Sequence, residues 1–115
     1  MKRDRLYLLK PNFMDGNAGP YFCPGCAQML GLLEFYPVLK EKLEIRFLDF
    51  PRPRAELVQL IGEENQSCPV LVLNQAPSGS AATFAVQQAN GHWFVTGAEE
   101  ISSYLAATYG TGIPH

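Results

Sequence analysis

The four residues Cys23-Pro24-Gly25-Cys26 are the part of the sequence best suited to chemistry. Pro24 fits the first position of a helix, where its missing N–H leaves no hydrogen bond unmade. The motif therefore predicts a helix that begins at Cys23. A thiolate at a helix N-terminus is stabilised by unpaired backbone N–H groups and by the positive end of the helix dipole, so such a cysteine is a good nucleophile. Cys26 follows one turn later, close enough for a disulfide with Cys23.

Two other interpretations of this Cys-x-x-Cys motif stay open. It could be half of a zinc site, although the sequence has no second Cys-x-x-Cys and no His-x-x-x-His pair. The cysteines could also be buried side chains of an apolar helix, which suits Cys26 better than Cys23. Three hypotheses follow: redox chemistry, a metal or iron–sulfur role, and a thiol-inert interaction module.

The composition excludes several classes of protein. The chain has 115 residues, 47% of them apolar, and a net charge of −2 with His neutral. This balance gives no basic surface for nucleic acid. The longest apolar run has the length of one strand, whereas a membrane-spanning helix needs about 20 apolar residues. We expect one domain, residues 1–115, with neither a nucleic-acid nor a membrane partner.

The cysteine count and the N-terminal residues indicate whether the protein is secreted or cytoplasmic. Three cysteines are an odd number, which does not suit the disulfide framework of a small secreted protein. Residues 1–5 are charged like the start of a signal peptide, but the apolar run at residues 6–9 is shorter than such a peptide requires. The sequence favours a cytoplasmic protein whose thiols are free or redox-active.

The hydrophobic pattern predicts an α/β fold. Strands are expected at residues 6–9, 44–50, 69–73 and 92–95, with an optional extra strand at 84–88 before the hairpin signal Asn90-Gly91. Residues 12–20 and 75–82 are expected to be loops. The order β-α-β-α-β-β-α gives a mixed sheet of four strands, or five with the extra one, with helices on both faces. Its first two strands should be parallel.

Three helices are expected between these strands. The first begins at the cysteine motif, ends near Tyr36 and buries an apolar stripe, and the second spans residues 54–61. The stripe of the first helix consists of Cys26, Met29, Leu30 and Leu33. The last helix is expected to start with a capping box formed by Thr96 and Glu99 and to end at Gly110.

The element order and two motifs resemble the thioredoxin-like superfamily. Cys23-Pro24-Gly25-Cys26 follows the first strand, and Cys68-Pro69-Val70-Leu71 opens the third. Tyr21-Phe22-Cys23-Pro24 and residues 101–106 are similar to glutaredoxins and to the N-terminal domain of glutathione transferases. The whole pattern also resembles a bacterial family of small thioredoxin-like proteins without an assigned function. The resemblance covers nearly the full chain.

The resemblance implies both a thioredoxin-like fold and a site. In that family the proline that matches Pro69 is cis and faces the Cys-x-x-Cys pair. We therefore expect a cis Cys68–Pro69 bond and expect Cys68 to lie near Cys23. Pro69 would shape a substrate groove, with Cys68, Tyr21 and Phe22 as further substrate-binding residues. Cys68 is either a small packing residue or a third thiol of the same site.

The leading functional hypothesis is a small thiol–disulfide oxidoreductase. Cys23 would attack a protein or small-molecule disulfide and form a mixed disulfide, which Cys26 would resolve. We expect no resident cofactor and no metal, with glutathione as a candidate co-substrate. The alternatives are a non-catalytic thioredoxin-like interaction module and a thiolate protein that binds a metal or an iron–sulfur cluster.

Several residues depart from the family pattern or carry weaker signals. Glutathione transferases have an acid–Ser pair before the last helix, where this chain has Gly97 and Ala98, with Glu99 and Glu100 as nearby substitutes. Segment 11–22 is longer than its counterpart in glutaredoxins, which could displace Lys10 from the thiolate. The arginines of the Pro-rich turn, Arg52 and Arg54, are expected to be solvated surface charges.

Overall fold

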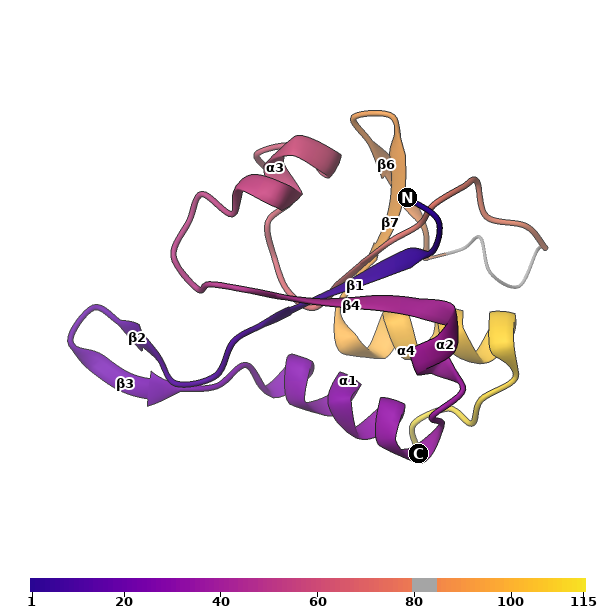
Figure 1. Cartoon of the computed structure of the whole chain (residues 1–115), viewed down its shortest axis with the longest axis horizontal. Helices are drawn as coiled ribbons and strands as arrows, with labels where there is room; N and C mark the ends of the chain where they lie inside the picture. Colours follow the sequence, from indigo (N-terminus) through magenta and orange to yellow (C-terminus); the bar gives the residue numbers. More distant parts are fainter. Residues whose placement is uncertain (80–84) are drawn as a thin grey trace.

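The computed structural model describes residues 1–79 and 85–115 and arranges them around a five-stranded mixed sheet (Figure 1). Across the sheet the strands are β4 (Leu43–Leu48), β1 (Asp4–Leu9), β5 (Val70–Val72), β7 (His92–Thr96) and β6 (Gln87–Ala89). β1 and β4 are parallel, whereas every other neighbouring pair is antiparallel. The predicted parallel pair and the predicted extra strand are therefore both confirmed.

Helices cover both faces of this sheet, as predicted. α1 (Pro24–Phe35) and α4 (Ala98–Tyr109) lie on one face, and α3 (Ala55–Ile61) lies on the other (Figure 1). A short helix that the sequence did not predict, α2 (Leu39–Lys42), leads into β4. None of the described helices combines the length and the apolar character needed to cross a membrane.

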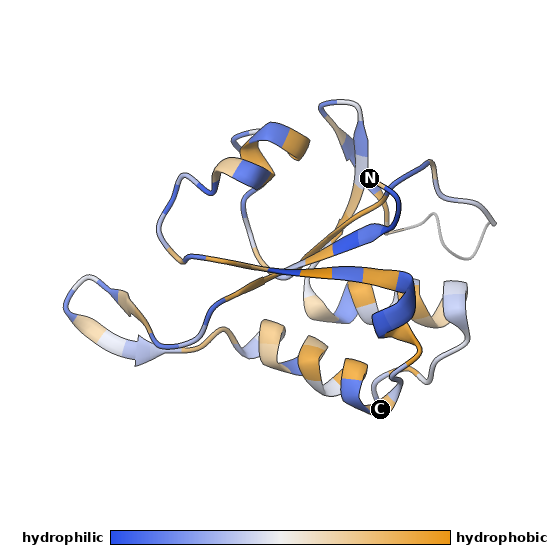
Figure 2. Ribbon diagram, viewed as in Figure 1, coloured by the Kyte–Doolittle hydropathy of each residue, from blue (hydrophilic) through white to orange (hydrophobic). Residues whose placement is uncertain are grey.

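The side chains of β1 alternate between two hydrophobic clusters, because successive residues of a strand point to opposite faces. Leu6 and Leu8 are fully buried in the cluster under α1 and α4. Tyr7, between them, is fully buried with Leu57 and Ile61 of α3. Figure 2 shows apolar residues gathered along these central strands, between the helices. The sheet is thus the middle of three layers, as the apolar run at residues 6–9 predicted.

Two predictions about the helices are wrong. Leu30, expected in the buried stripe of α1, is 44% exposed. Thr96 does not cap α4, because it is the last residue of β7 and pairs with Val70. Gly97, with a φ of 88°, takes the N-cap instead and makes no side-chain capping bond. At the other end Gly110 closes α4 in the left-handed conformation, as predicted.

Residues 12–20, predicted to be a loop, contain a second small sheet. β2 (Phe13–Asp15) and β3 (Ala18–Tyr21) form an antiparallel hairpin that extends away from the main sheet, beside the start of α1 (Figure 1). The ring of Phe13 stacks on the ring of Phe50, with centroids 4.2 Å apart and planes 8° from parallel. This stack attaches the base of the hairpin to the loop after β4.

Other boundaries differ from the predicted ones by one or two residues. The strands predicted at 44–50 and 69–73 are observed at Leu43–Leu48 and Val70–Val72. The predicted loop 75–82 and the predicted strand 84–88 fall partly on residues 80–84, which lie outside the described residues.

We predict that Phe13→Ala frees the hairpin and leaves the main sheet intact. An aromatic pair contributes about 1 kcal/mol beyond its buried area, and this pair holds the hairpin base. Hydrogen–deuterium exchange should accelerate in residues 13–21 and stay unchanged in β1 and β5. Met14→Ala is the matched control, because Met14 is 50% exposed. Faster exchange throughout the main sheet of Phe13→Ala would contradict the prediction.

Candidate functional site

Cys23 is the N-cap of α1, as the motif predicted. Its backbone is extended and its Sγ accepts a hydrogen bond from the backbone N–H of Cys26 at 3.1 Å. Pro24 follows in the first turn of the helix, where no N–H is needed. Cys23 is half-buried, so the sulfur lies at the helix N-terminus and at the border of the protein surface.

Cys26 is the buried member of the pair, with 3% of its surface exposed. Its Sγ accepts a hydrogen bond from the backbone N–H of Leu9, at the end of β1, at 3.4 Å. Burial, and then the hydrogen bond with the Cys23 thiol, raise the pKa of Cys26 to about 12. Cys26 is therefore protonated at neutral pH, and the two thiols, both free, are chemically different.

The segment before β5 lies against the cysteine motif. The Cys68–Pro69 bond is cis, as the resemblance implied. Cys23 Sγ lies 3.8 Å from the backbone oxygen of Cys68, which confirms the expected proximity through the main chain. A Cβ added to Gly25 would lie 3.1 Å from Pro69 Cδ. The glycine of the motif therefore permits the close approach of α1 to Pro69, which is itself buried.

The Cys68 side chain is half-buried and packs against both hydrophobic clusters. Burial raises the pKa of its thiol to about 11, and the positive charges of Arg54 and Arg52 oppose that rise. Cys68 is therefore also a neutral thiol at physiological pH. In residues 1–79 and 85–115, no group of three or more His, Cys, Asp or Glu side chains gathers as metal ligands do.

Arg54 is a site residue that the sequence analysis missed. It was expected to be solvated, yet it is only 7% exposed. Its guanidinium donates to the backbone oxygen of Phe50 at 2.6 and 3.0 Å and to that of Gln66 at 2.6 Å. It thus connects the loop after β4 to the loop that leads into Cys68. Nothing in the local sequence distinguishes Arg54 from Arg52, which is exposed as expected.

Two predicted substrate-binding residues border Cys23 on the hairpin side. Tyr21 ends β3 and is 47% exposed, and Phe22, which follows it, is 63% exposed. They are the two exposed aromatic residues that directly precede Cys23 in the chain. Lys10, whose counterpart in glutaredoxins lies near the thiolate, here forms an ion pair with Asp49, with Nζ and Oδ1 2.9 Å apart.

The N-terminus of α4 reaches the same region from the other side. The Cβ of Ala98 would lie 3.6 Å from a Cβ added to Gly25. Glu99 and Glu100, in the first turn of α4, are exposed. The site therefore lies where the N-termini of α1 and α4 meet the segment that precedes β5.

One protein-family model matches almost the whole chain. The family described as "Protein of unknown function (DUF3088)" matches residues 3–113. The chain belongs to the DUF3088 family. No curated protein and no solved structure matches it. Because the match runs from before β1 to beyond α4, all three cysteines lie within the DUF3088 domain.

We predict that this DUF3088 domain reacts with substoichiometric iodoacetamide at Cys23 first. Cys26 and Cys68 have pKa values raised to about 12 and about 11, so both are protonated at neutral pH, where alkylation needs a thiolate. Peptide mass spectrometry measures the labelled fraction of each cysteine. Protein unfolded in urea, in which all three should react alike, is the control. Labelling of Cys68 as fast as Cys23 in the folded protein would overturn the prediction.

We also predict that Arg54→Lys lowers the free energy of unfolding by about 2 kcal/mol, because a lysine cannot span both carbonyls that the guanidinium binds. Urea unfolding measures the change. Arg52→Lys in the same turn is the control and should be nearly neutral, since Arg52 is exposed. Equal stabilities for the two variants would show that the Arg54 bonds contribute little.

Proposed function

We propose that this protein is a thiol–disulfide oxidoreductase with a thioredoxin-like fold, in which Cys23 attacks and Cys26 resolves. The observation that carries the proposal is the asymmetry of the cysteine pair. Cys23 caps a helix and accepts an N–H at 3.1 Å, whereas Cys26 is buried with its pKa raised to about 12. One thiol is thus positioned to react with an external disulfide, and the other is held back until the first has reacted.

The order of the elements supports the thioredoxin-like part of this proposal. Apart from the hairpin β2–β3, the short α2 and the edge strand β6, the chain runs β1, α1, β4, α3, β5, β7, α4. This is the β-α-β-α-β-β-α order that the hydrophobic pattern predicts and on which the resemblance to the thioredoxin-like superfamily is based. The cysteine motif follows the first strand of this series, and Cys68–Pro69 precedes the third.

The reaction consists of two exchange steps. In the first, the Cys23 thiolate attacks one sulfur of the substrate disulfide, a bond forms between Cys23 and that sulfur, and the other substrate sulfur leaves as a thiolate that takes a proton from water. In the second, Cys26 gives up its proton and attacks the Cys23 sulfur, and the remaining substrate sulfur leaves as a thiol. The substrate gains two electrons and two protons, and the protein is left with a Cys23–Cys26 disulfide.

The surroundings of Cys26 suit this order of events. Burial is the largest cause of the raised pKa of Cys26, and the hydrogen bond with the Cys23 thiol is the second; this second cause ends when Cys23 enters a mixed disulfide. The Leu9 N–H, which donates to Cys26 Sγ at 3.4 Å, then favours the thiolate. Cys26 therefore becomes a better nucleophile at the step that requires it.

The substrate would lie between the aromatic side chains before Cys23 and the segment around Pro69. Tyr21 and Phe22 offer exposed apolar surface, and the Cys68 backbone lies beside the reactive sulfur. A protein or small-molecule disulfide fits this description. An external thiol, with glutathione as the candidate, would reduce the Cys23–Cys26 disulfide again, as expected in a reducing compartment such as the cytoplasm.

The test is a stoichiometric reaction of the reduced protein with bis(2-hydroxyethyl) disulfide. The parent should lose two thiols and form an internal disulfide, whereas Cys26→Ser should retain a mercaptoethanol adduct on Cys23, because no resolving thiol remains. Cys23→Ser should not react at this site. Intact mass and peptide mapping measure each product.

Cys68→Ser is the control and should behave like the parent. A parent protein that keeps all its thiols would favour a non-catalytic module. Visible absorption of anaerobically purified protein would favour an iron–sulfur protein instead.

A further inference from the structure

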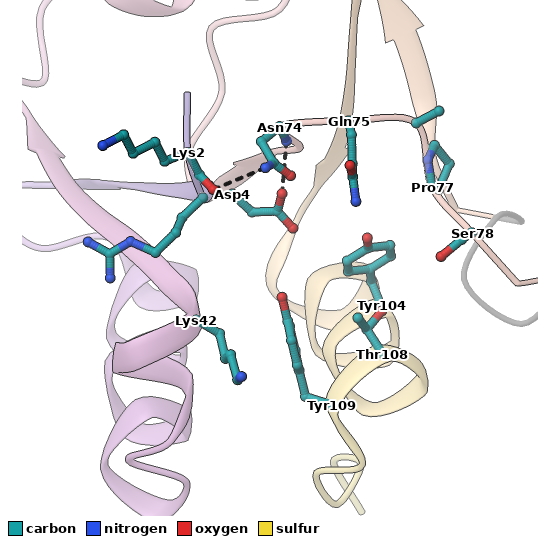
Figure 3. Close-up of a pocket in the computed structure, with 12 residues that line it drawn as sticks. Lys2, Asp4, Lys42, Asn74, Gln75, Pro77, Ser78, Tyr104, Thr108 and Tyr109 are labelled. Atoms are coloured by element: carbon teal, nitrogen blue, oxygen red, sulfur yellow. Dashed lines mark hydrogen bonds between the residues drawn. The ribbon is translucent and has the colours of Figure 1, made fainter.

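A separate cavity lies at the opposite end of β1 from the cysteine pair. Asp4 opens β1 there, whereas Leu9, which donates to Cys26, closes it. The cavity has a volume of about 200 Å³ and lies between the start of β1, the turn after β5 and the last turns of α4 (Figure 3). Its polar lining includes Asp4, Asn74, Gln75, Tyr104, Tyr109 and Lys42.

Asp4 is a buried carboxylate without a cationic partner among the described residues. It is 8% exposed, and Oδ1 accepts the backbone N–H of Asn74 at 2.8 Å, but no described Lys, Arg or His forms an ion pair with it. The neighbouring cations are directed elsewhere: Arg3 donates to the backbone oxygen of Glu41, and the Lys2 side chain points away from Asp4 (Figure 3). A buried charge is costly unless an opposite charge accompanies it. Burial accordingly raises the pKa of Asp4, and the hydrogen bond from the Asn74 N–H opposes that rise.

Two tyrosines complete the inner part of the cavity. Tyr104 is 6% exposed, and Tyr109 is half-buried with its hydroxyl directed toward Asp4 (Figure 3). Burial, and then the charge of Asp4, raise the pKa of both phenols, so both hydroxyls are protonated. Phenol oxygens accept hydrogen bonds from an ammonium group, and the ring faces attract a cation. The inner part of the cavity is therefore suited to a positive group.

The rim of the cavity carries the opposite charge. Lys42, the last residue of α2, lines the cavity and is exposed, and its side chain extends from α2 toward Tyr109 (Figure 3). A simple anion that entered the cavity would meet Asp4, and a diamine would place its second charge near Lys42. Lys2 and Arg3 also line the cavity, so among the described residues Asp4 is its one acidic lining residue beside three cations. A ligand with a cation at one end and an anion at the other complements both Asp4 and Lys42.

We propose that this cavity binds a small amino-acid-type zwitterion, whose primary ammonium pairs with Asp4 and whose carboxylate pairs with Lys42. The volume of about 200 Å³ is below the range usual for drug-sized ligands, which favours a ligand of a few carbons. The site uses none of the three cysteines and does not depend on the proposed redox function.

Three probes with the same carbon chain test the proposal: γ-aminobutyrate, n-butylamine and butyrate. NMR titration of the backbone amides measures each affinity, and shifts are expected at residues 4, 74 and 109. γ-Aminobutyrate should bind about tenfold more tightly than n-butylamine, because it makes one more charge-assisted contact, and butyrate should not bind. Binding of butyrate, or no binding of either amine, would contradict the proposed binding site. Equal affinity for γ-aminobutyrate and n-butylamine would overturn the role of Lys42.

Two variants test the contacts at the two ends of the ligand separately. Asp4→Asn keeps an oxygen that can accept the Asn74 N–H, so the turn is preserved while the charge is lost, and both amines should cease to bind. Lys42→Gln should reduce γ-aminobutyrate to the affinity of n-butylamine and leave n-butylamine unchanged. Lys40→Gln, in the same helix but outside the cavity lining, is the control. Unaltered amine binding by Asp4→Asn would overturn the proposal.

Discussion

The burial of β1 on both faces is the constraint on which the rest of the structure depends. Leu6, Tyr7 and Leu8 are completely inaccessible, so helices must cover both sides of the strand, and β4 and β5 must pair with its two edges. The same strand fixes both sites. Its last residue, Leu9, donates to Cys26, and its first, Asp4, is the buried carboxylate of the second cavity. The central strand therefore separates two regions of distinct chemistry.

The chemistry of the cysteine site follows from unequal solvation of similar groups. All three cysteines are free. Cys23 and Cys68 are half-buried and Cys26 is buried, and Cys23 is the one that caps a helix. Burial raises the pKa of the Cys26 and Cys68 thiols, so both are protonated at neutral pH. Arg54 moderates this effect at Cys68 and at the same time holds together the loops that carry it. Stability and thiol chemistry are therefore connected in this region.

The sequence identified the features that rest on local rules. The strand and helix order, the helix start at Cys23 and the turn at Asn90-Gly91 were all predictable, because each depends on neighbouring residues. Asn90 and Gly91 both have a positive φ, as a type I′ turn requires. The missed hairpin had a comparable signal: Gly16-Asn17 is a known two-residue hairpin turn, and Gly16 has a φ of 64°. Its flanking strands lack the usual alternation of apolar and polar residues, which concealed it.

Features that depend on tertiary contacts were not predictable. The capping box at Thr96 was a valid local pattern, but strand pairing with Val70 keeps that residue extended. Arg52 and Arg54 have almost the same sequence neighbours, and what distinguishes the buried Arg54 is its contacts with Phe50 and with Gln66 of a later loop. Asp4 belongs to a charged N-terminal run, and its burial arises from Asn74, which is 70 residues away along the chain.

The cysteine pair can be tested most directly by its redox equilibrium. The protein would be equilibrated across a series of reduced and oxidised dithiothreitol mixtures, quenched by alkylation and mapped by peptide mass spectrometry. The account predicts one reversible transition of two electrons, in which Cys23 and Cys26 become linked and Cys68 remains alkylated throughout. A protein whose three thiols stay alkylated at every ratio, or whose disulfide includes Cys68 in place of Cys26, would contradict it.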